Sequence, residues 1–424
     1  MNKRIADKQI IFFISYGLFL VMSLLRTTLY YHYLGGTKFK LGFVFCVLLV
    51  IAGDFFLNTN TRRMIVGLLI TCAYIAVSFL TQEGENMYFF VSAAIFVYAS
   101  RNIPFRKIAK FSVAVLALLM LFVIASSQIG IIKDFVSDDG RNRHYLGFRY
   151  ALYPSTVLMN ITMLYVYIRK QRIMWLEILA LAAFNAAIYV VTGSRLAVII
   201  SFVVCFMAAF LKVWPEFLSA KKVLKYIISM AFIIFAALSL FMSVKFNENS
   251  AIQSKLNDVL SGRLYYQKEA MDRYGFSVLG NDVELKGEGL TAEGEKVYKT
   301  GDDEYFYIDN NYVSWFVING AVFFVMIVGL CTAMCIRSVR YERQGYLLMI
   351  LALMALFCMI QDTFLNVHFN TFLLAAGNLV LNTKTEEEIE AEDPGNHIAW
   401  RRIRVRFAGR IRLRKAGYGR VQSK

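Results

Sequence analysis

The chain has 424 residues, of which 58% are hydrophobic and 15% aromatic, and its mean hydropathy is +0.52. Only 18% are charged, against about 25% in a typical soluble protein, and these charges fall between long apolar runs. The composition excludes an ordinary soluble domain. It predicts an all-α polytopic membrane protein, because a helix of roughly 20 apolar residues satisfies its own backbone hydrogen bonds in lipid.

In chain order, the apolar runs predict about 12 transmembrane helices. The runs cover residues 10–28, 41–57, 64–80, 87–100, 111–131, 151–168, 174–191, 196–211, 226–243, 313–335, 346–363 and 370–382. The fourth and the last are short. The first follows Lys3, Arg4 and Lys8 without a small-residue cleavage site, so we expect a retained signal anchor.

Lysine and arginine residues near the ends of the runs predict the orientation, because cytoplasmic loops are enriched in them. They gather in alternate connections: Arg62 and Arg63; Arg101, Arg106, Lys107 and Lys110; Arg169, Lys170 and Arg172; Lys212, Lys221, Lys222 and Lys225; Arg337, Arg340 and Arg343. Several of the other connections, such as 81–87, hold no basic residue. With twelve spans, both termini are expected on the cytoplasmic side.

The six cysteines all lie inside apolar runs, so we expect no disulfide in an outer loop. Cys331 and Cys335 are one helical turn apart, as a pair of metal ligands can be. No third or fourth ligand accompanies them, so packing in the core is the favoured interpretation. We expect neither a metal site nor a cofactor.

Two outer segments are long enough to build a site, residues 132–150 and 244–312. The second is one large extracytoplasmic loop between helices 1–9 (residues 1–243) and helices 10–12 (residues 313–384). Within it, residues 251–273 have the apolar periodicity of a helix that lies on the membrane surface or covers a cavity.

Residues 385–424 form a cytoplasmic tail that is first acidic and then basic. Ten lysines or arginines and no acid lie between Trp400 and Lys424, interleaved with apolar side chains. Such a segment can bind anionic lipids of the inner leaflet. The alternative is a solvated tail that only enforces the topology. We expect no nucleic acid partner.

Three arginines are expected at the outer boundary of the membrane: Arg149, Arg195 and Arg263. Charged residues beside apolar spans are costly and need a reason. The guanidinium fork fits phosphate oxygens and stays charged, so three arginines that face one cavity suit a lipid-linked diphosphate. The alternative is that each arginine extends to the lipid headgroups.

Asp309 precedes the apolar run at 313–335, where a carboxylate can act as general base toward a sugar hydroxyl. Its alternative role is to cap the helix. Asp362 and His368 flank the outer end of the eleventh run, where they can pair or titrate. The acidic groups at 138–139 and 302–304 are interpreted as solvated turns.

Four local motifs, in this order along the chain, resemble the O-antigen polymerase and ligase superfamily, and most of all the Wzy-type polymerases of capsular and exopolysaccharide clusters. They are Gly147-Phe148-Arg149-Tyr150, Thr192-Gly193-Ser194-Arg195, Ser261-Gly262-Arg263 and Asp309-Asn310-Asn311-Tyr312 with the glycine at 320. The resemblance extends to about residue 384. The ligase branch tends to carry a histidine in the large outer loop, and residues 244–312 have none, which favours a polymerase.

This resemblance implies a GT-C-like fold in a bacterial cell membrane and an undecaprenyl-diphosphate-linked oligosaccharide as substrate. The growing glycan would move from its lipid diphosphate onto a lipid-linked repeat at the outer face, without a nucleotide sugar or a metal. Asp309, Arg195 and Arg263 would carry the catalysis. The residues expected to bind substrate are Arg149, Tyr265, Tyr266, Asn310, Tyr312, Arg143 and His144.

Besides an O-antigen-ligase-like transferase, the sequence fits two other classes of protein as alternatives to a polymerase. A transporter or lipid-linked oligosaccharide flippase suits twelve spans, although the long outer loop and the lack of an internal repeat argue against it. A scaffold that binds other polysaccharide-assembly proteins through the basic tail is the second.

Overall fold

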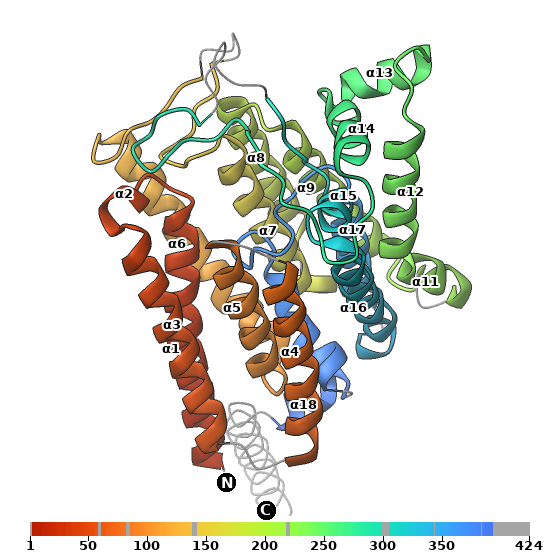
Figure 1. Cartoon of the computed structure of the whole chain (residues 1–424). Helices are drawn as coiled ribbons and strands as arrows, with labels where there is room; N and C mark the ends of the chain where they lie inside the picture. The colour runs from red at the N-terminus through yellow and green to blue at the C-terminus, as the bar shows by residue number, and fades with distance from the viewer. Residues whose placement is uncertain are drawn as a thin grey trace, which may run out of the picture.

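The protein is described from a computed structural model, shown in Figure 1. The structure describes residues 2–57, 61–81, 85–137, 142–217, 221–297, 305–342, 344–382 and 384–392. The acidic groups at 138–139 and 302–304 and the basic tail therefore lie outside the described residues. Within the described ranges the chain is helical, and extended pairing is limited to isolated bridges.

The helices up to the middle of the chain are α1 (Asn2–Arg26), α2 (Tyr31–Leu34), α3 (Gly36–Leu57), α4 (Thr61–Thr81), α5 (Glu85–Ser100), α6 (Phe105–Gln128), α7 (Leu152–Arg169), η1 (Lys170–Arg172), α8 (Trp175–Thr192) and α9 (Arg195–Val213). The second half holds α11 (Lys222–Ser229), α12 (Ala231–Lys245), α13 (Ala251–Val259), α14 (Arg263–Tyr274), α15 (Asn311–Val317), α16 (Gly320–Tyr341), α17 (Tyr346–Phe357), η2 (Thr371–Leu374), η3 (Gly377–Leu381) and α18 (Glu386–Glu392).

Six of the described helices are long and apolar enough to cross a membrane: α1, α3, α6, α8, α9 and α16. Helices α11 and α12 together pass the same test but meet at an angle of 50°. Four shorter apolar helices lie in α4, α5, α17 and the segment 371–381. The all-helical class is therefore confirmed, with six candidate membrane spans, whereas the predicted count of about 12 is not.

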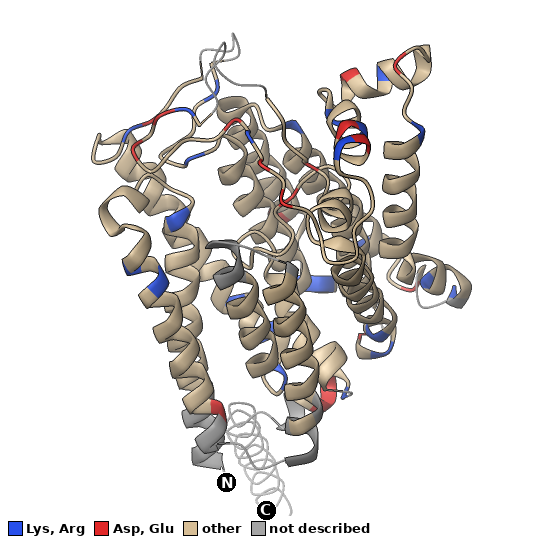
Figure 2. Cartoon of the chain, viewed as in Figure 1, with Lys and Arg blue, Asp and Glu red and all other residues tan. Residues whose placement is uncertain are grey.

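The surfaces of these helices have the character expected against lipid. Large apolar side chains are exposed on them, including Leu41, Leu121, Leu179, Phe206 and Phe241. Charged residues lie mostly in the connections and near the helix ends (Figure 2). Helix α7, by contrast, packs against α6, α8, α9 and α17 and buries Ser155, Thr156 and Asn160, so protein rather than lipid surrounds most of it.

The two ends of the bundle differ. The first residues of α1 and helix α18 lie at one end, which we call the tail end (Figure 1). The connections 129–137 and 275–297 lie at the opposite end, the loop end (Figure 1). The chain is thus arranged with its first residues and its last described helix at the same end.

The last two predicted helices differ from the structure. The run at 346–363 ends as a helix at Phe357, and the run at 370–382 consists of a 3-10 turn and a π turn. Side-chain amides cause the irregular shape: Asn378 donates to the carbonyls of residues 100, 101 and 103. A Cβ on Gly377 would lie 2.4 Å from the carbonyl oxygen of Val97, so only glycine permits this close approach to α5.

The predicted run at 313–335 is broken into α15 and α16. Gly320 begins α16 with φ +82°, and a Cβ there would lie 2.4 Å from the backbone nitrogen of Gly280. The loop is fastened at this point, because Asn281 donates its backbone N–H to Ile318 and Ala321 donates to Ser277. The glycine thus lets the large loop reach the entry to α16.

The predicted helix at 251–273 is two helices, α13 and α14. Ser261 and Gly262 have φ values of 60° and 81°, and this left-handed conformation ends α13. Of the apolar residues that give 251–273 its helical periodicity, Leu264 is buried, whereas Ile252 and Val259 are exposed. These residues therefore contribute little to the core.

Arg101, counted above among the basic residues that predict the orientation, is buried. Its Nη2 lies 2.8 Å from Oδ2 of Asp54, and its Nη1 lies 3.2 Å from Oδ1. The two side chains join the end of α5 to α3. A bidentate pair of this kind is strong in a water-poor setting, because either charge alone would be costly to bury.

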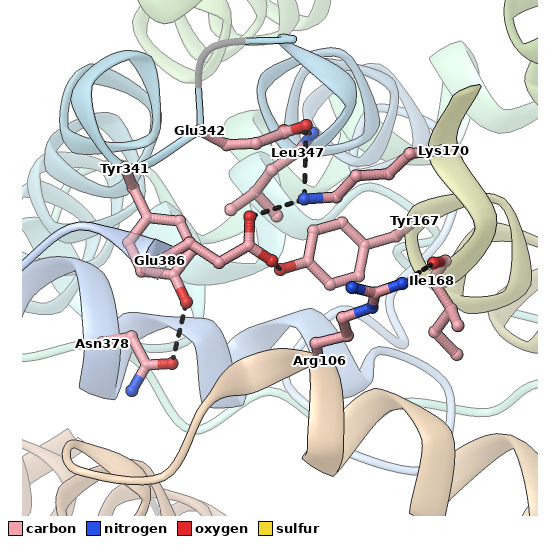
Figure 3. Close-up of polar contacts among 9 residues, drawn as sticks. All are labelled: Arg106, Tyr167, Ile168, Lys170, Tyr341, Glu342, Leu347, Asn378 and Glu386. Atoms are coloured by element: carbon pink, nitrogen blue, oxygen red, sulfur yellow. Dashed lines mark hydrogen bonds and ion pairs between the residues drawn. The ribbon is translucent and has the colours of Figure 1, made fainter. Parts of the chain in front are cut away.

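Helix α18 is attached to the tail end by a second polar cluster (Figure 3). The ammonium group of Lys170 lies 2.5 Å from Oε2 of Glu386 and 3.6 Å from Oε1 of Glu342. The hydroxyl of Tyr167 donates to Glu386 at 2.9 Å, and Glu342 accepts the backbone N–H of Leu347 at 2.8 Å. One cation is thus shared by two carboxylates from different segments.

Candidate functional site at the loop end

A cavity of about 300 Å³ lies between the end of α1, the start of α7 and the large loop. We call it the first cavity. Its charged, histidine and tyrosine lining consists of Arg26, Arg149, Tyr150, Tyr153, Glu288, Tyr305, Tyr307, Asp309, Asp362 and His368. Glu288 lies in an exposed part of the loop, so the inner lining combines arginines, tyrosines and two aspartates.

The segment before α15 supplies three of these side chains through its extended backbone. Successive residues of an extended segment point to opposite sides. Tyr305, Tyr307 and Asp309 line the first cavity, whereas Phe306 and Ile308 are buried in a small apolar cluster with Ala270, Val313 and Val317. The apolar residues therefore hold the segment in place while the alternate residues face the cavity.

Asp309 is paired with Arg263. The guanidinium Nε of Arg263 lies 2.8 Å from Oδ2 of Asp309, and both side chains are largely buried. Ser261 and Gly262 directly precede α14, so that Arg263, its first residue, reaches this carboxylate. Two of the predicted site residues, far apart in sequence, thus form one ion pair.

Arg149 joins three segments at the first cavity. Its Nε donates to the carbonyl of Leu290 at 2.8 Å, and its backbone N–H donates to the carbonyl of Thr27 at 2.9 Å. Its guanidinium carbon lies 5.2 Å from the centre of the Tyr31 ring. These contacts use one guanidinium nitrogen, and the described residues provide no hydrogen bond for the other two.

Asp362 faces the same cavity from the connection after α17. The hydroxyl of Tyr307 donates to its Oδ2 at 2.5 Å. Burial raises the pKa of Asp362 to about 6, and the neighbouring charge of Asp309 adds to this shift. A carboxyl group with such a pKa is ionised at neutral pH and is more basic than an ordinary aspartate.

The other predicted arginine, Arg195, is not part of this arrangement. It is exposed at the start of α9 and lines none of the described cavities. The side chain of Arg143 lies against Gly193, in the turn before Arg195. A Cβ at residue 193 would lie 3.3 Å from a carbon of that side chain. His144 bonds to Asp134 at 2.6 Å. Arg143 and His144 likewise do not line the first cavity.

The predicted aromatic and amide residues also lie outside the lining. Tyr312 is fully buried and donates to the carbonyl of Ala355, so its ring faces protein. Asn310 caps α15, since its side chain accepts the backbone N–H groups of Tyr312 and Val313. Tyr265 is exposed beside Tyr266, and only Tyr266 approaches the cavity, with its ring 5.0 Å from that of Tyr305.

Sequence reasoning missed Arg26, Tyr305 and Tyr307, although each had a signal. Arg26 lies inside the first apolar run, and a charge within such a run is a reason to expect function. The tyrosines alternate with Phe306 and Ile308, the pattern of an extended segment with one polar face. Asp362 was noted as a titratable group but was not placed in the site.

The arrangement can bind an anion and hold a proton. Among the described residues no group of three or more His, Cys, Asp or Glu side chains is placed to hold a metal ion. No model of a known protein family, no curated protein and no solved structure matches the chain.

Proposed function

We propose that the protein is a polysaccharide polymerase that transfers a growing glycan from undecaprenyl diphosphate onto a lipid-linked repeat at the outer face of a bacterial cell membrane. The observation that supports this function is the first cavity. Its lining includes Arg149 and Asp309, from two of the four motifs that resemble the polymerase and ligase superfamily, and Arg263 of a third motif is ion-paired with Asp309.

The chain's own residues suit the chemistry of this transfer. Arg149, whose terminal nitrogens have no partner among the described residues, binds the diphosphate. Arg26 adds positive charge to the lining, which stabilises the diphosphate as it leaves. Tyr150, Tyr153 and Tyr305 provide surfaces on which sugar rings can stack. The bond between the glycan and the diphosphate supplies the energy, so no nucleotide sugar is required.

The proposal includes the membrane topology. In this proposal, twelve crossings with a GT-C-like arrangement are counted as the six candidate spans, the bent α11–α12 pair and the four shorter apolar helices, with α7 added as the twelfth. The loop end is then extracytoplasmic and both termini are cytoplasmic. Anionic lipids at the basic tail, and other polysaccharide-assembly proteins, are the remaining expected partners.

Arg149→Ala, with Arg195→Ala as the matched control, tests the proposed function. The protein is reconstituted in liposomes with the undecaprenyl-diphosphate-linked repeat, which is extracted from cells that lack this protein. The length of the glycan product is measured on gels. Loss of Arg149 is expected to slow elongation about 100-fold or more, the usual effect of removing one group that stabilises developing charge. The exposed Arg195 is expected to be replaceable.

Two results would contradict the proposal. The first is that the wild-type protein does not lengthen the repeat. The second is that Arg149→Ala, inserted and folded normally, makes polymer of full length. Movement of the lipid across the bilayer without elongation would support a flippase instead.

A further inference from the structure

A second cavity of about 660 Å³ adjoins the first and has a different chemical character. It lies between α15, the loop at 279–285 and the connection after α17. Its lining includes Asn281, Asp282, Ser314, Asn319 and Trp315. None of the described residues that line it is a lysine or an arginine.

The two cavities share one wall. Tyr153, Leu285, Tyr307, Asp362 and Asn366 line both of them. Arginines lie on one side of this wall, and the other side has amides, a hydroxyl, a tryptophan and the exposed carboxylate of Asp282. Neutral polar groups beside an aromatic ring are suited to a carbohydrate, whereas arginines are suited to phosphate.

Asp362 and Tyr307 occupy the position in the wall where the two ligands would meet. The hydroxyl of Tyr307 holds Oδ2 of Asp362 at 2.5 Å. The ring of Tyr307 lies against Gly287, and a Cβ at residue 287 would lie 2.6 Å from that ring, so the close approach requires glycine. Tyr307 thus positions the carboxylate through Oδ2, and Oδ1 can accept a hydrogen bond from a ligand.

We propose that the second cavity binds the sugar that carries the accepting hydroxyl, and that Asp362 is the general base that takes its proton. This inference rests on the proposed polymerase function. Asp309 is less suited to the role, since its Oδ2 is held by the guanidinium of Arg263 at 2.8 Å. Asp362 contacts both cavities and has no such cation on it among the described residues.

The step balances in atoms and electrons. The hydroxyl oxygen of the acceptor sugar forms a bond to the anomeric carbon of the donor glycan, and its proton passes to the carboxylate of Asp362. The bond from that carbon to the diphosphate breaks, and its electron pair leaves on the diphosphate, which Arg149 faces. The raised pKa of Asp362, about 6, suits a proton acceptor near neutral pH.

The first test is Asp362→Asn in the liposome assay described above. We expect kcat to fall about 100- to 10,000-fold, the usual worth of a general base. Binding of undecaprenyl diphosphate, measured by thermal shift, is expected to stay within about twofold of the wild type, because the amide keeps the shape of the side chain. The control is Asp272→Asn, which changes an exposed carboxylate of α14 and is expected to leave the rate unchanged.

The second test is Ser314→Trp, which fills the second cavity from α15. Elongation is expected to stop while undecaprenyl diphosphate still binds, because the first cavity is not altered. The thermal shift also shows whether each variant is folded. Asp362→Glu, which keeps the carboxyl group, is expected to recover more activity than Asp362→Asn.

The inference and the proposed function fail in different ways. If the wild type does not elongate the repeat, the polymerase proposal is wrong. If the wild type elongates it and a folded Asp362→Asn variant works at a similar rate, the assignment of the base is wrong. If the folded Ser314→Trp variant elongates normally, the acceptor site does not lie in the second cavity.

Discussion

At the scale of single residues, two aspartates at the loop end have different partners and therefore different chemistry. Asp309 forms an ion pair with the guanidinium of Arg263, which keeps its charge at any physiological pH. Asp362 accepts a hydrogen bond from the hydroxyl of Tyr307. The guanidinium of Arg263 occupies Oδ2 of Asp309. Asp362 has a neutral partner and a pKa raised by burial, which suits a proton acceptor. The environment, rather than the residue type, separates their roles.

The pH dependence of elongation follows from the same contacts. The pKa of Asp362 is raised to about 6 by burial and by the charge of Asp309, while Arg263 opposes the shift. Tyr307 and Tyr153 are the other titratable groups that face it. Because the base must be ionised, activity is expected to be low below pH 6, to rise through about pH 6 and to level off above it.

A pH–rate profile of the wild type and of Asp362→Asn measures this effect. The rise near pH 6 is expected only in the wild type. A profile that rises at the same pH in both proteins would show that another group titrates.

At the scale of elements, the attachment of α18 depends on one buried cation. Lys170 is the residue that follows α7, with φ 47°, and it lies between Glu342 and Glu386. Burial raises the pKa of Glu342, and Lys170 opposes this shift by favouring the charged carboxylate. The cluster therefore joins three segments that are distant in sequence (Figure 3).

Lys170→Met is expected to destabilise this junction by about 3 kcal/mol, because it leaves two carboxylates without their cation. Methionine fits the same left-handed backbone as poorly as lysine does, so the change isolates the charge. Thermal unfolding in detergent and protease cleavage after α17 measure the effect. The matched control is Lys268→Met, which removes an exposed pair with Asp272 and is expected to cost under about 1 kcal/mol.

In the double variant Lys170→Met with Glu342→Gln, the negative charge of Glu342 is removed together with the positive charge of Lys170. Partial recovery of stability is expected from it. If Lys170→Met is no less stable than the Lys268→Met control, the ion cluster does not hold α18.

At the scale of the whole molecule, the proposed twelve crossings place the loop end outside and the tail end inside the cell. The connection between α12 and α13 lies at the loop end (Figure 1) and includes the exposed Asn249. Arg172 is exposed in η1, whose first residue, Lys170, is paired with Glu386 of α18 at the tail end. In a cysteine-free background, a membrane-impermeant thiol reagent added to intact cells is expected to label Asn249→Cys. Arg172→Cys is expected to be labelled only after the cells are opened.

The reverse pattern would invert the proposed orientation. Labelling of both positions in intact cells would show that the two ends lie on one side. Either result would remove the basis for an outward-facing site.

Much of the architecture could be predicted from the sequence because burial in lipid is a local property of a run of residues. Runs such as 111–131 and 196–211 correspond to α6 and α9 with little change. The departures have two causes, long-range side-chain contacts and local backbone conformation. Asn378 pulls the segment 377–381 into a π turn, and Ser261 and Gly262 divide the predicted loop helix. The partners of Asn378 lie far away in the chain, at residues 100, 101 and 103, whereas the break at 261–262 is local. Apolar periodicity reveals neither of them.

For the candidate site, the sequence by itself determined which residue types were available at the membrane boundary, since a charge next to an apolar run is visible in one dimension. It pointed to Arg149, Arg263 and Asp309, which the structure places together at the first cavity, the arginine at 263 through its ion pair. Only the tertiary structure decided which groups share a cavity. It set Arg195 and Tyr312 aside, brought in Arg26, Tyr307 and Asp362, and placed Asp362 in the wall between two cavities. The physical reason is that solvation and partners fix the chemistry of a carboxylate, and both depend on how distant segments pack.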